Sequence, residues 1–216
     1  MELKNKTILF LGDSITEGYG ASDISNRFTN LIAEQTGANC VNYGVSGTRI
    51  AYQHAFNPEK SEDYDFYMRA QKMQADADCI VVFGGTNDYD HGDAPFGSFT
   101  DRTPMTFYGG LHTLYTYLTE KYLGVPVVIL TPLHRENEDN GNVTRTYAYK
   151  PLKEYVNAIR EVAEYYSFPV LDLFATSNLQ PNIPAVKEAF IPDGLHPNDA
   201  GHKILANKII KFLETL

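Results

Sequence analysis

Short runs that are apolar throughout alternate with longer amphipathic segments along this chain, and this alternation constrains its fold more than any other feature. The runs with the length and composition of β-strands cover residues 6–11, 39–43, 79–83, 125–130 and 168–173. Apolar residues recur at helical spacing in residues 26–35, 111–122, 152–163 and 204–213. Strands that are apolar on both faces form parallel sheets that helices cover on both sides. The chain is therefore predicted to be an α/β protein, a three-layer α/β/α sandwich with a five-stranded parallel sheet of the flavodoxin-like kind.

Length and composition limit the architecture and the partners. A chain of 216 residues fits one α/β domain, and no linker or internal repeat divides it, so a single domain over residues 1–216 is predicted. Hydrophobic residues make up 43% and charged residues 21% of the chain, which is typical of a globular protein with a packed core. With 27 acidic and 18 basic residues and no basic cluster, the net charge of −9 would repel a phosphate backbone, so nucleic acid is an unfavourable partner.

The N-terminal segment and the two cysteines bear on the compartment. The apolar run at residues 8–11 is far too short for a signal sequence or a membrane span, so a cytoplasmic protein without a membrane span is expected. Cys40 and Cys79 lie in predicted strands on opposite sides of a third strand, about 10 Å apart. This separation is too large for a disulfide and agrees with a reducing compartment.

Four polar, turn-forming motifs follow the predicted strands or precede the last helix. The carboxyl ends of parallel strands meet at one edge of the sheet, where ligands bind in folds of this kind. After the first strand, residues 12–16 read GDSIT, which puts Ser14 in a tight turn with an exposed hydroxyl and a free N–H. After the second strand, NYGVSG at residues 42–47 lets the Gly44 N–H point into the crevice.

The other two motifs supply an amide, carboxylates and an imidazole. GGTND at residues 84–88 offers the Asn87 side chain to a developing oxyanion and the Asp88 carboxylate to hold the loop. DGLHP places Asp193 three residues before His196 in a glycine-containing turn. Taken singly, each motif also fits an ordinary turn, a helix cap or a surface histidine. Together they provide the nucleophile, the base, the acid and the oxyanion donors that acyl transfer requires.

In this order, the motifs GDSITEGYG, NYGVSG, GGTND and DGLHP resemble the conserved blocks of the SGNH hydrolase superfamily, the GDSL-like lipases, acylhydrolases and esterases. The match extends over residues 12–197. This resemblance implies that Ser14 is the nucleophile and His196 its base, with Asp193 orienting the base. It also implies three oxyanion donors, which are the N–H groups of Ser14 and Gly44 and the side chain of Asn87. Members of this family differ widely in substrate, so substrate identity does not follow from the resemblance.

The leading hypothesis is a serine esterase that hydrolyses carboxylic esters through an acyl-enzyme, with a small-molecule ester as substrate and no cofactor. The predicted loops at residues 51–64, 89–103 and 136–147 are rich in Tyr, Asn, Asp and His, which suits short acyl groups on a small or carbohydrate-like alcohol. A lysophospholipase or thioesterase acting on longer acyl chains is the alternative. A flavodoxin-like module that binds a ligand without catalysis is a third hypothesis, but the chain has no P-loop lysine and no GxGxxG motif. The sequence leaves a homo-oligomer open.

Further polar and aromatic residues have two interpretations each. Five of them follow the predicted strands and either contact substrate or are solvated loop residues: Arg49, Tyr89, His91, His134 and Arg135. His202 has too few histidine, cysteine or carboxylate partners at coordinating spacing, so no metal site is predicted. Four aromatic residues around the longest loop either line a pocket or pack a lid or a subunit contact: Phe96, Phe99, Phe107 and Tyr108.

Overall fold

The central sheet has five parallel strands in the order β2-β1-β3-β4-β5. The computed structural model describes residues 1–139 and 150–216. The strands are β1 (Thr7–Gly12), β2 (Asn39–Gly44), β3 (Cys79–Phe83), β4 (Val127–Leu130) and β5 (Val170–Leu171). The predicted α/β fold with a five-stranded parallel sheet is therefore confirmed. Strand β5 is shorter than predicted, because Pro169 has no N–H to donate and the Asp172 side chain already caps the next helix.

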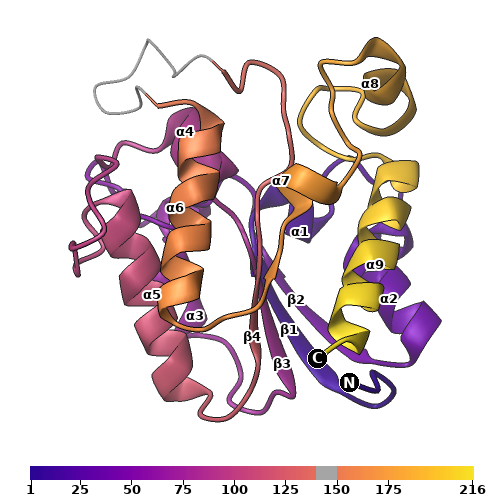
Figure 1. Cartoon of the computed structure of the whole chain (residues 1–216), viewed down its shortest axis with the longest axis horizontal. Helices are drawn as coiled ribbons and strands as arrows, with labels where there is room; N and C mark the ends of the chain where they lie inside the picture. The colour runs from indigo at the N-terminus through magenta and orange to yellow at the C-terminus, as the bar shows by residue number, and fades with distance from the viewer. Residues whose placement is uncertain (140–149) are drawn as a thin grey trace.

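Helices cover both faces of the sheet (Figure 1). On one face lie α3 (Phe66–Ala70), α5 (Phe107–Lys121) and α6 (Leu152–Tyr165). On the other face lie α2 (Phe28–Thr36) and α9 (Asp199–Glu214), which contact each other. All four predicted helices are present, and α5 and α9 begin before the first apolar residue of their patterns because Thr106 and Asn198 cap their first turns.

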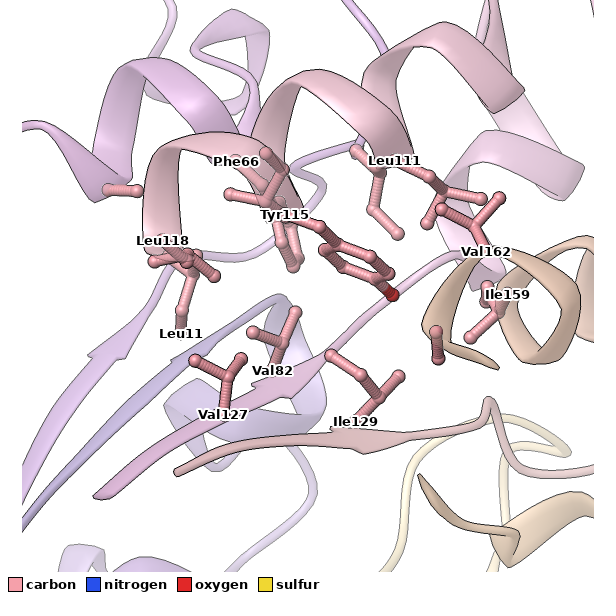
Figure 2. Packing of buried hydrophobic residues seen from close by; sticks show 14 of the residues in the cluster. Leu11, Phe66, Val82, Leu111, Tyr115, Leu118, Val127, Ile129, Ile159 and Val162 are labelled. Atoms are coloured by element: carbon pink, nitrogen blue, oxygen red, sulfur yellow. The ribbon is translucent and has the colours of Figure 1, made fainter. Parts of the chain in front are cut away.

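Successive residues of the inner strands enter two different hydrophobic cores. In β1, Leu9 and Leu11 belong to the core beneath α3, α5 and α6, whereas Ile8 and Phe10 belong to the core beneath α2 and α9. Figure 2 shows the first core, in which the Tyr115 ring of α5 lies above strands β3 and β4. The strands are apolar throughout because each of their faces is buried under helices.

The register of the sheet places the two cysteines on either side of Ile8. Cys40 of β2 and Cys79 of β3 both pair with Ile8 of β1, so one strand separates them, as the sequence predicts. Both cysteines are free. Burial raises the pKa of both thiols to about 12, so they are protonated at neutral pH and are poor nucleophiles.

Short helices that the sequence pattern does not predict follow the strands or lie within the connections. Besides α3, they are α1 (Ser14–Glu17), η1 (Ile24–Asn26), η2 (Ser61–Asp63), α4 (Thr86–His91), α7 (Leu173–Thr176) and α8 (Pro184–Phe190). Helix α4 takes up the start of the loop predicted at residues 89–103, and η2 lies within the loop predicted at 51–64. Of the loop predicted at 136–147, residues 140–147 lie outside the described residues. In the described part of the chain, no helix is long and apolar enough to cross a membrane.

Candidate active site

Ser14 is the first residue of helix α1, directly beyond the end of β1. Asp13 caps this helix by accepting a hydrogen bond from the Ile15 N–H at 3.0 Å. Only glycine fits at position 12, because a Cβ atom on Gly12 would lie 2.0 Å from Thr16 Oγ1. The start of a helix leaves N–H groups without intrahelical acceptors, and the Ser14 N–H has no acceptor within residues 1–139 and 150–216. The strand end and the cap thus fix the position of both the hydroxyl and the N–H of Ser14.

Two hydrogen bonds join Ser14 to the loop that precedes α9. Ser14 Oγ lies 3.0 Å from His196 Nε2, and His196 Nδ1 lies 2.7 Å from Asp193 Oδ2. Because an ionised carboxylate only accepts hydrogen bonds, the network assigns the imidazole proton to Nδ1 and leaves Nε2 to accept from the serine hydroxyl. The fold thus brings together a hydroxyl and an imidazole that are 182 positions apart in the sequence.

The carboxylate of Asp193 is held by its own loop. Its Oδ1 accepts hydrogen bonds from the N–H groups of Leu195 at 2.9 Å and His196 at 2.7 Å. Gly194 has a φ of +80°, in the left-handed region that favours glycine. Burial alone would raise the pKa of Asp193, but the hydrogen bonds from His196 and Leu195 outweigh it and lower this pKa. The group is therefore ionised at neutral pH and able to orient the imidazole.

Tyr19 makes a further contact with the imidazole. The ring centroids of Tyr19 and His196 are 4.4 Å apart, and Tyr19 is 58% exposed. The Tyr19 N–H donates to the Ser14 carbonyl at 2.9 Å, which ties this aromatic ring to the helix that carries the serine. Tyr19 lies in the GDSITEGYG motif, but the sequence alone suggests no function for it. The reason is that its contact is with His196, which is far away in the sequence.

The groups predicted to bind an oxyanion differ in their contacts. Asn87 is buried at the start of α4, and its Nδ2 donates to the Thr48 carbonyl at 3.0 Å. The Gly44 N–H donates to Asn42 Oδ1 at 2.8 Å and would have to give up this bond to reach an oxyanion. The role of the Gly44 N–H as an oxyanion donor therefore stays a prediction.

Gly47, which sequence reasoning does not single out, has a backbone N–H in the turn after β2. Its N–H has no acceptor in the described part of the chain. It directly precedes Thr48, whose carbonyl holds the Asn87 amide, so Gly47 lies beside Asn87 in the fold. The signal in the sequence is the second glycine of the NYGVSG motif, which ends the turn that follows β2.

Two buried charged side chains fix the loops that carry these groups. Asp88 accepts hydrogen bonds from the N–H groups of Ile50 and Ala51, both at 2.9 Å, and thus holds the segment after β2, whereas the sequence suggests that it holds the loop of its own motif after β3. Burial raises the pKa of Asp88 to about 6. The second side chain is Arg69 of α3, which binds both the loop after β2 and the end of β1.

Arg69 fastens the carboxyl ends of β1 and β2 to each other. Its guanidinium donates to the Gly12 carbonyl at 2.9 Å, to Thr48 Oγ1 at 2.8 Å and to the Tyr43 carbonyl. Burial lowers the pKa of Arg69 to about 10, so the group is still charged at neutral pH. No local pattern reveals this residue, because α3 is only five residues long and lies outside the four motifs.

The polar residues with two interpretations have partners within the protein. Arg49 is only 5% exposed and pairs with Asp63 at 2.6 Å, so it is not a solvated loop residue. The other four are also bound within the protein: His91 to Arg49, Arg135 to Asp90, His134 to Glu138 and Tyr89 to the Asn137 carbonyl. Each of these side chains is thus held in one arrangement near the carboxyl ends of the strands.

His202 and most of the aromatic residues belong to the interior. His202 is buried in α9, where its Nδ1 accepts from the Phe28 N–H at 3.4 Å, and burial lowers its pKa to about 4. No three metal-binding side chains gather anywhere in the described residues. The Phe96 ring centroid lies 6.0 Å from that of Phe107 and 5.3 Å from that of Tyr108, and these rings pack with the core beneath α5 and α6.

Solved structures resemble this fold over its whole length. A protein from Lactobacillus plantarum is 32% identical to this chain, with a TM-score of 0.83 and 98% of each chain covered. A lipase/acylhydrolase from Enterococcus faecalis is 22% identical, with a TM-score of 0.66 over 97% of this chain and 96% of that one. A member of the lipolytic protein G-D-S-L family from Veillonella parvula is 19% identical, with a TM-score of 0.68 over 97% of this chain and 99% of that one. The last two likenesses show the fold alone.

The sequence itself also matches a family model. The model of the GDSL-like lipase/acylhydrolase family matches residues 10–204, which include all four motifs. Comparison with curated proteins gives no match. The chain therefore belongs to the GDSL-like lipase/acylhydrolase family and is a hydrolase of ester bonds.

Proposed function

We propose that this protein is a serine esterase that hydrolyses carboxylic esters through a covalent acyl-enzyme. The observation that carries the proposal is the chain of hydrogen bonds from Ser14 through His196 to Asp193. Such a chain lets the imidazole take the serine proton while the carboxylate keeps the imidazole in the required tautomer. A module that only binds a ligand does not require these three groups to be aligned.

The proposed reaction has two halves. First, Ser14 Oγ attacks the ester carbonyl carbon while His196 Nε2 takes the hydroxyl proton. The protonated imidazole gives this proton to the departing alcohol, and the acyl group stays on Ser14. In the second half, His196 activates a water molecule that hydrolyses the acyl-enzyme and restores the serine hydroxyl. Asp193 stays ionised throughout and stabilises the positive charge on the imidazole.

The negative charge that develops on the carbonyl oxygen needs hydrogen-bond donors. We assign this role to the Ser14 N–H, to the Asn87 side chain and to one backbone N–H in the turn after β2. Gly44 is the donor that the sequence predicts, but its N–H is bound to Asn42. The Gly47 N–H, which has no acceptor among the described residues, supports Gly47 as the third donor.

The proposed substrates are esters of short acyl groups with a small or carbohydrate-like alcohol. Phe107 is buried in the core beneath α5 and α6, and the partly buried Phe96 and Tyr108 pack against this core, so these rings mainly contact other parts of the protein. This arrangement supports a short acyl group over the long chains of a lysophospholipase or thioesterase substrate. The free Cys40 and Cys79 support a reducing, cytoplasmic location.

Covalent labelling tests the proposed nucleophile. An organophosphonate or sulfonyl fluoride should add once to the wild-type protein, and peptide mapping should place the adduct on Ser14. Ser14→Ala should take no label, His196→Ala should react far more slowly, and Ser98→Ala, which changes an exposed serine, should label like the wild type. An unmodified mass for the wild type after prolonged exposure would contradict an activated serine.

Acyl-chain length is measured with a series of chromogenic esters. For p-nitrophenyl esters from acetyl to dodecanoyl, kcat/KM is expected to be highest for the shortest acyl groups. A maximum at octanoyl or longer would favour the lysophospholipase or thioesterase alternative over the proposed substrate class.

A further inference from the structure

A cavity of about 590 Å³ lies between the loop that follows β2 and the end of α4. Small-molecule sites in proteins typically have volumes of about 300–1,000 Å³, so the cavity is large enough for a ligand. Ser46 and Gly47 contribute to one wall, and His91 and Asp93 contribute to another.

The walls of this cavity continue the segments that carry the proposed catalytic groups. The Ser46 N–H donates to Glu17 Oε2 at 2.7 Å, and Glu17 belongs to the helix that begins at Ser14. His91 lies four residues after Asn87 on α4, so the two side chains lie on the same side of this helix. The cavity therefore lies next to the proposed oxyanion donors, one of which, Gly47, lines it.

Several polar side chains of the cavity wall are already held in place. Arg49 donates to Asp63 Oδ1 at 2.6 Å and to the Gly47 carbonyl at 2.9 Å. The side chain of Gln53 accepts a hydrogen bond from the Asp93 N–H at 3.2 Å. Polar groups that are fixed before binding confer specificity, because a ligand need not pay the entropy of ordering them.

Charges of both signs line the cavity. Arg49 and Lys60 are basic, whereas Glu62, Asp63 and Asp93 are acidic. This mixture does not favour a polyanion such as a nucleotide-bearing thioester. Among the described lining residues, no apolar side chain is larger than alanine, so a long acyl chain would bury little apolar surface there. The ligand that fits this lining is neutral and rich in hydroxyl groups.

We propose that this cavity binds the alcohol part of the ester and that this alcohol is a sugar or a similar neutral polyol. The inference rests on the proposed esterase function. In an ester of a polyol, the alcohol part carries the remaining hydroxyl groups, which donate to carboxylates and accept from guanidinium and amide groups. The ester carbonyl then lies at the oxyanion donors, at the mouth of the cavity.

Two acetate esters of similar size test this assignment. Methyl 6-O-acetyl-glucopyranoside presents three ring hydroxyl groups, whereas cyclohexylmethyl acetate has a ring of similar size without them. The wild-type protein should have a kcat/KM at least about tenfold higher for the sugar ester, because fixed polar groups would stay unpaired beside the cyclohexyl ring. Equal values, or a preference for cyclohexylmethyl acetate, would overturn the assignment.

A variant that fills the cavity tests whether the preference for the sugar ester arises there. Ala55 is exposed at the edge of the cavity, so Ala55→Trp narrows the space without removing a hydrogen-bonding side chain. The ratio of the two kcat/KM values should fall towards one, mainly through a higher KM for the sugar ester. Ala75→Trp, at an exposed alanine before β3 and at the other end of the sheet, is the matched control and should keep the wild-type ratio. A wild-type ratio in Ala55→Trp would contradict binding in this cavity.

A binding measurement on an inactive variant tests ligand binding in the cavity separately from ester hydrolysis. Ser14→Ala should bind methyl 6-O-acetyl-glucopyranoside saturably in an NMR titration, and the added Ala55→Trp substitution should weaken this binding. No saturable binding to Ser14→Ala would overturn the assignment. If the wild type hydrolyses neither ester and takes no phosphonate label, the proposed function itself fails. If it hydrolyses both esters without preferring the sugar ester, the function stands and only the assignment of the cavity fails.

Discussion

At the scale of single residues, His196 is held by contacts of three kinds. Ser14 lies at its Nε2, Asp193 lies at its Nδ1, and the Tyr19 ring packs against its imidazole. The first contact is the path of the transferred proton, and the second selects the tautomer that can accept this proton. The third places an aromatic ring next to a group that becomes positively charged during the proposed reaction, which is a favourable arrangement.

Replacing Asp193 with Asn should lower kcat by about 10³- to 10⁴-fold with little change in structure. The Asn amide would donate to Nδ1 and leave the proton on Nε2, so the imidazole of His196 could no longer accept the serine proton. The measurement is kcat for p-nitrophenyl acetate, with thermal unfolding as a check of the fold. Activity within tenfold of the wild type would show that Asp193 does not set the tautomer.

Replacing Asn87 with Ala should lower kcat by about 10²- to 10³-fold, because one oxyanion donor is lost. The substitution also leaves the buried Thr48 carbonyl without its donor, which costs about 1–3 kcal/mol of stability. Steady-state kinetics and urea unfolding measure the two effects separately. Asn182→Ala, at an exposed amide, is the control. Wild-type rates in folded Asn87→Ala would rule out the role proposed for this amide.

At the scale of secondary-structure elements, the site is built on very short helices that follow strands. Helix α1 begins two residues after the end of β1, and α4 begins three residues after the end of β3. Helices of four to six residues are not stable by themselves, so their positions depend on tertiary contacts. Arg69 and Asp88 supply such contacts, because they bind the backbone of neighbouring loops and strand ends.

Replacing Arg69 with Met should destabilise the protein by about 3–5 kcal/mol and lower kcat as well. The substitution leaves the Gly12 and Tyr43 carbonyls and Thr48 Oγ1 without this donor in a buried place. Urea unfolding measures the free energy, and the initial rate of p-nitrophenyl acetate hydrolysis measures the effect on the site. In contrast, Arg160→Met removes a partly exposed ion pair and should cost about 1 kcal/mol or less. Equal losses of unfolding free energy in the two variants would show that the hydrogen bonds of Arg69 contribute no more to stability than an exposed ion pair.

The elements that the sequence predicts are those with a long or continuous pattern. The inner strands and the four long helices follow from hydrophobic periodicity, and the chemical types of Ser14, Asn87 and His196 suggest their functions. The short helices have too few residues to show a period. The contacts of Arg69 and Tyr19 join segments far apart in the sequence, so no local pattern carries them. The bond between Gly44 and Asn42 likewise depends on the backbone geometry at the end of β2.

At the scale of the whole molecule, buried carboxyl groups gather near the carboxyl edge of the sheet. Burial raises the pKa of Asp13 to about 7 and the pKa values of Asp65 and Asp88 to about 6. Hydrogen bonds and the positive charge of Arg69 oppose this effect at Asp13 without cancelling it. These groups favour the folded state most when they are protonated, so they make stability depend on pH.

Asp13→Asn should remove one part of this pH dependence while keeping an oxygen that can cap α1. The unfolded chain releases the Asp13 proton near pH 4 and the folded chain releases it near pH 7. Between these values the folded state binds more protons, so raising the pH favours unfolding. The stability of the wild type relative to Asp13→Asn should be highest below pH 4 and should fall by up to about 4 kcal/mol by pH 7. Urea unfolding at several pH values tests this, and a constant difference would contradict it.

Because both faces of β1 are apolar, sliding this strand by one residue would exchange two sets of buried apolar side chains without moving a polar side chain into either core. Hydrophobic burial therefore does not by itself choose between the correct alignment and a slipped one. The choice falls to the strand ends. At one end the Thr7 N–H is bound by the Asp78 carboxylate at 2.8 Å, and at the other end any side chain in place of Gly12 would collide with Thr16. The turn that presents the nucleophile thus also helps to define the alignment of β1 in the sheet.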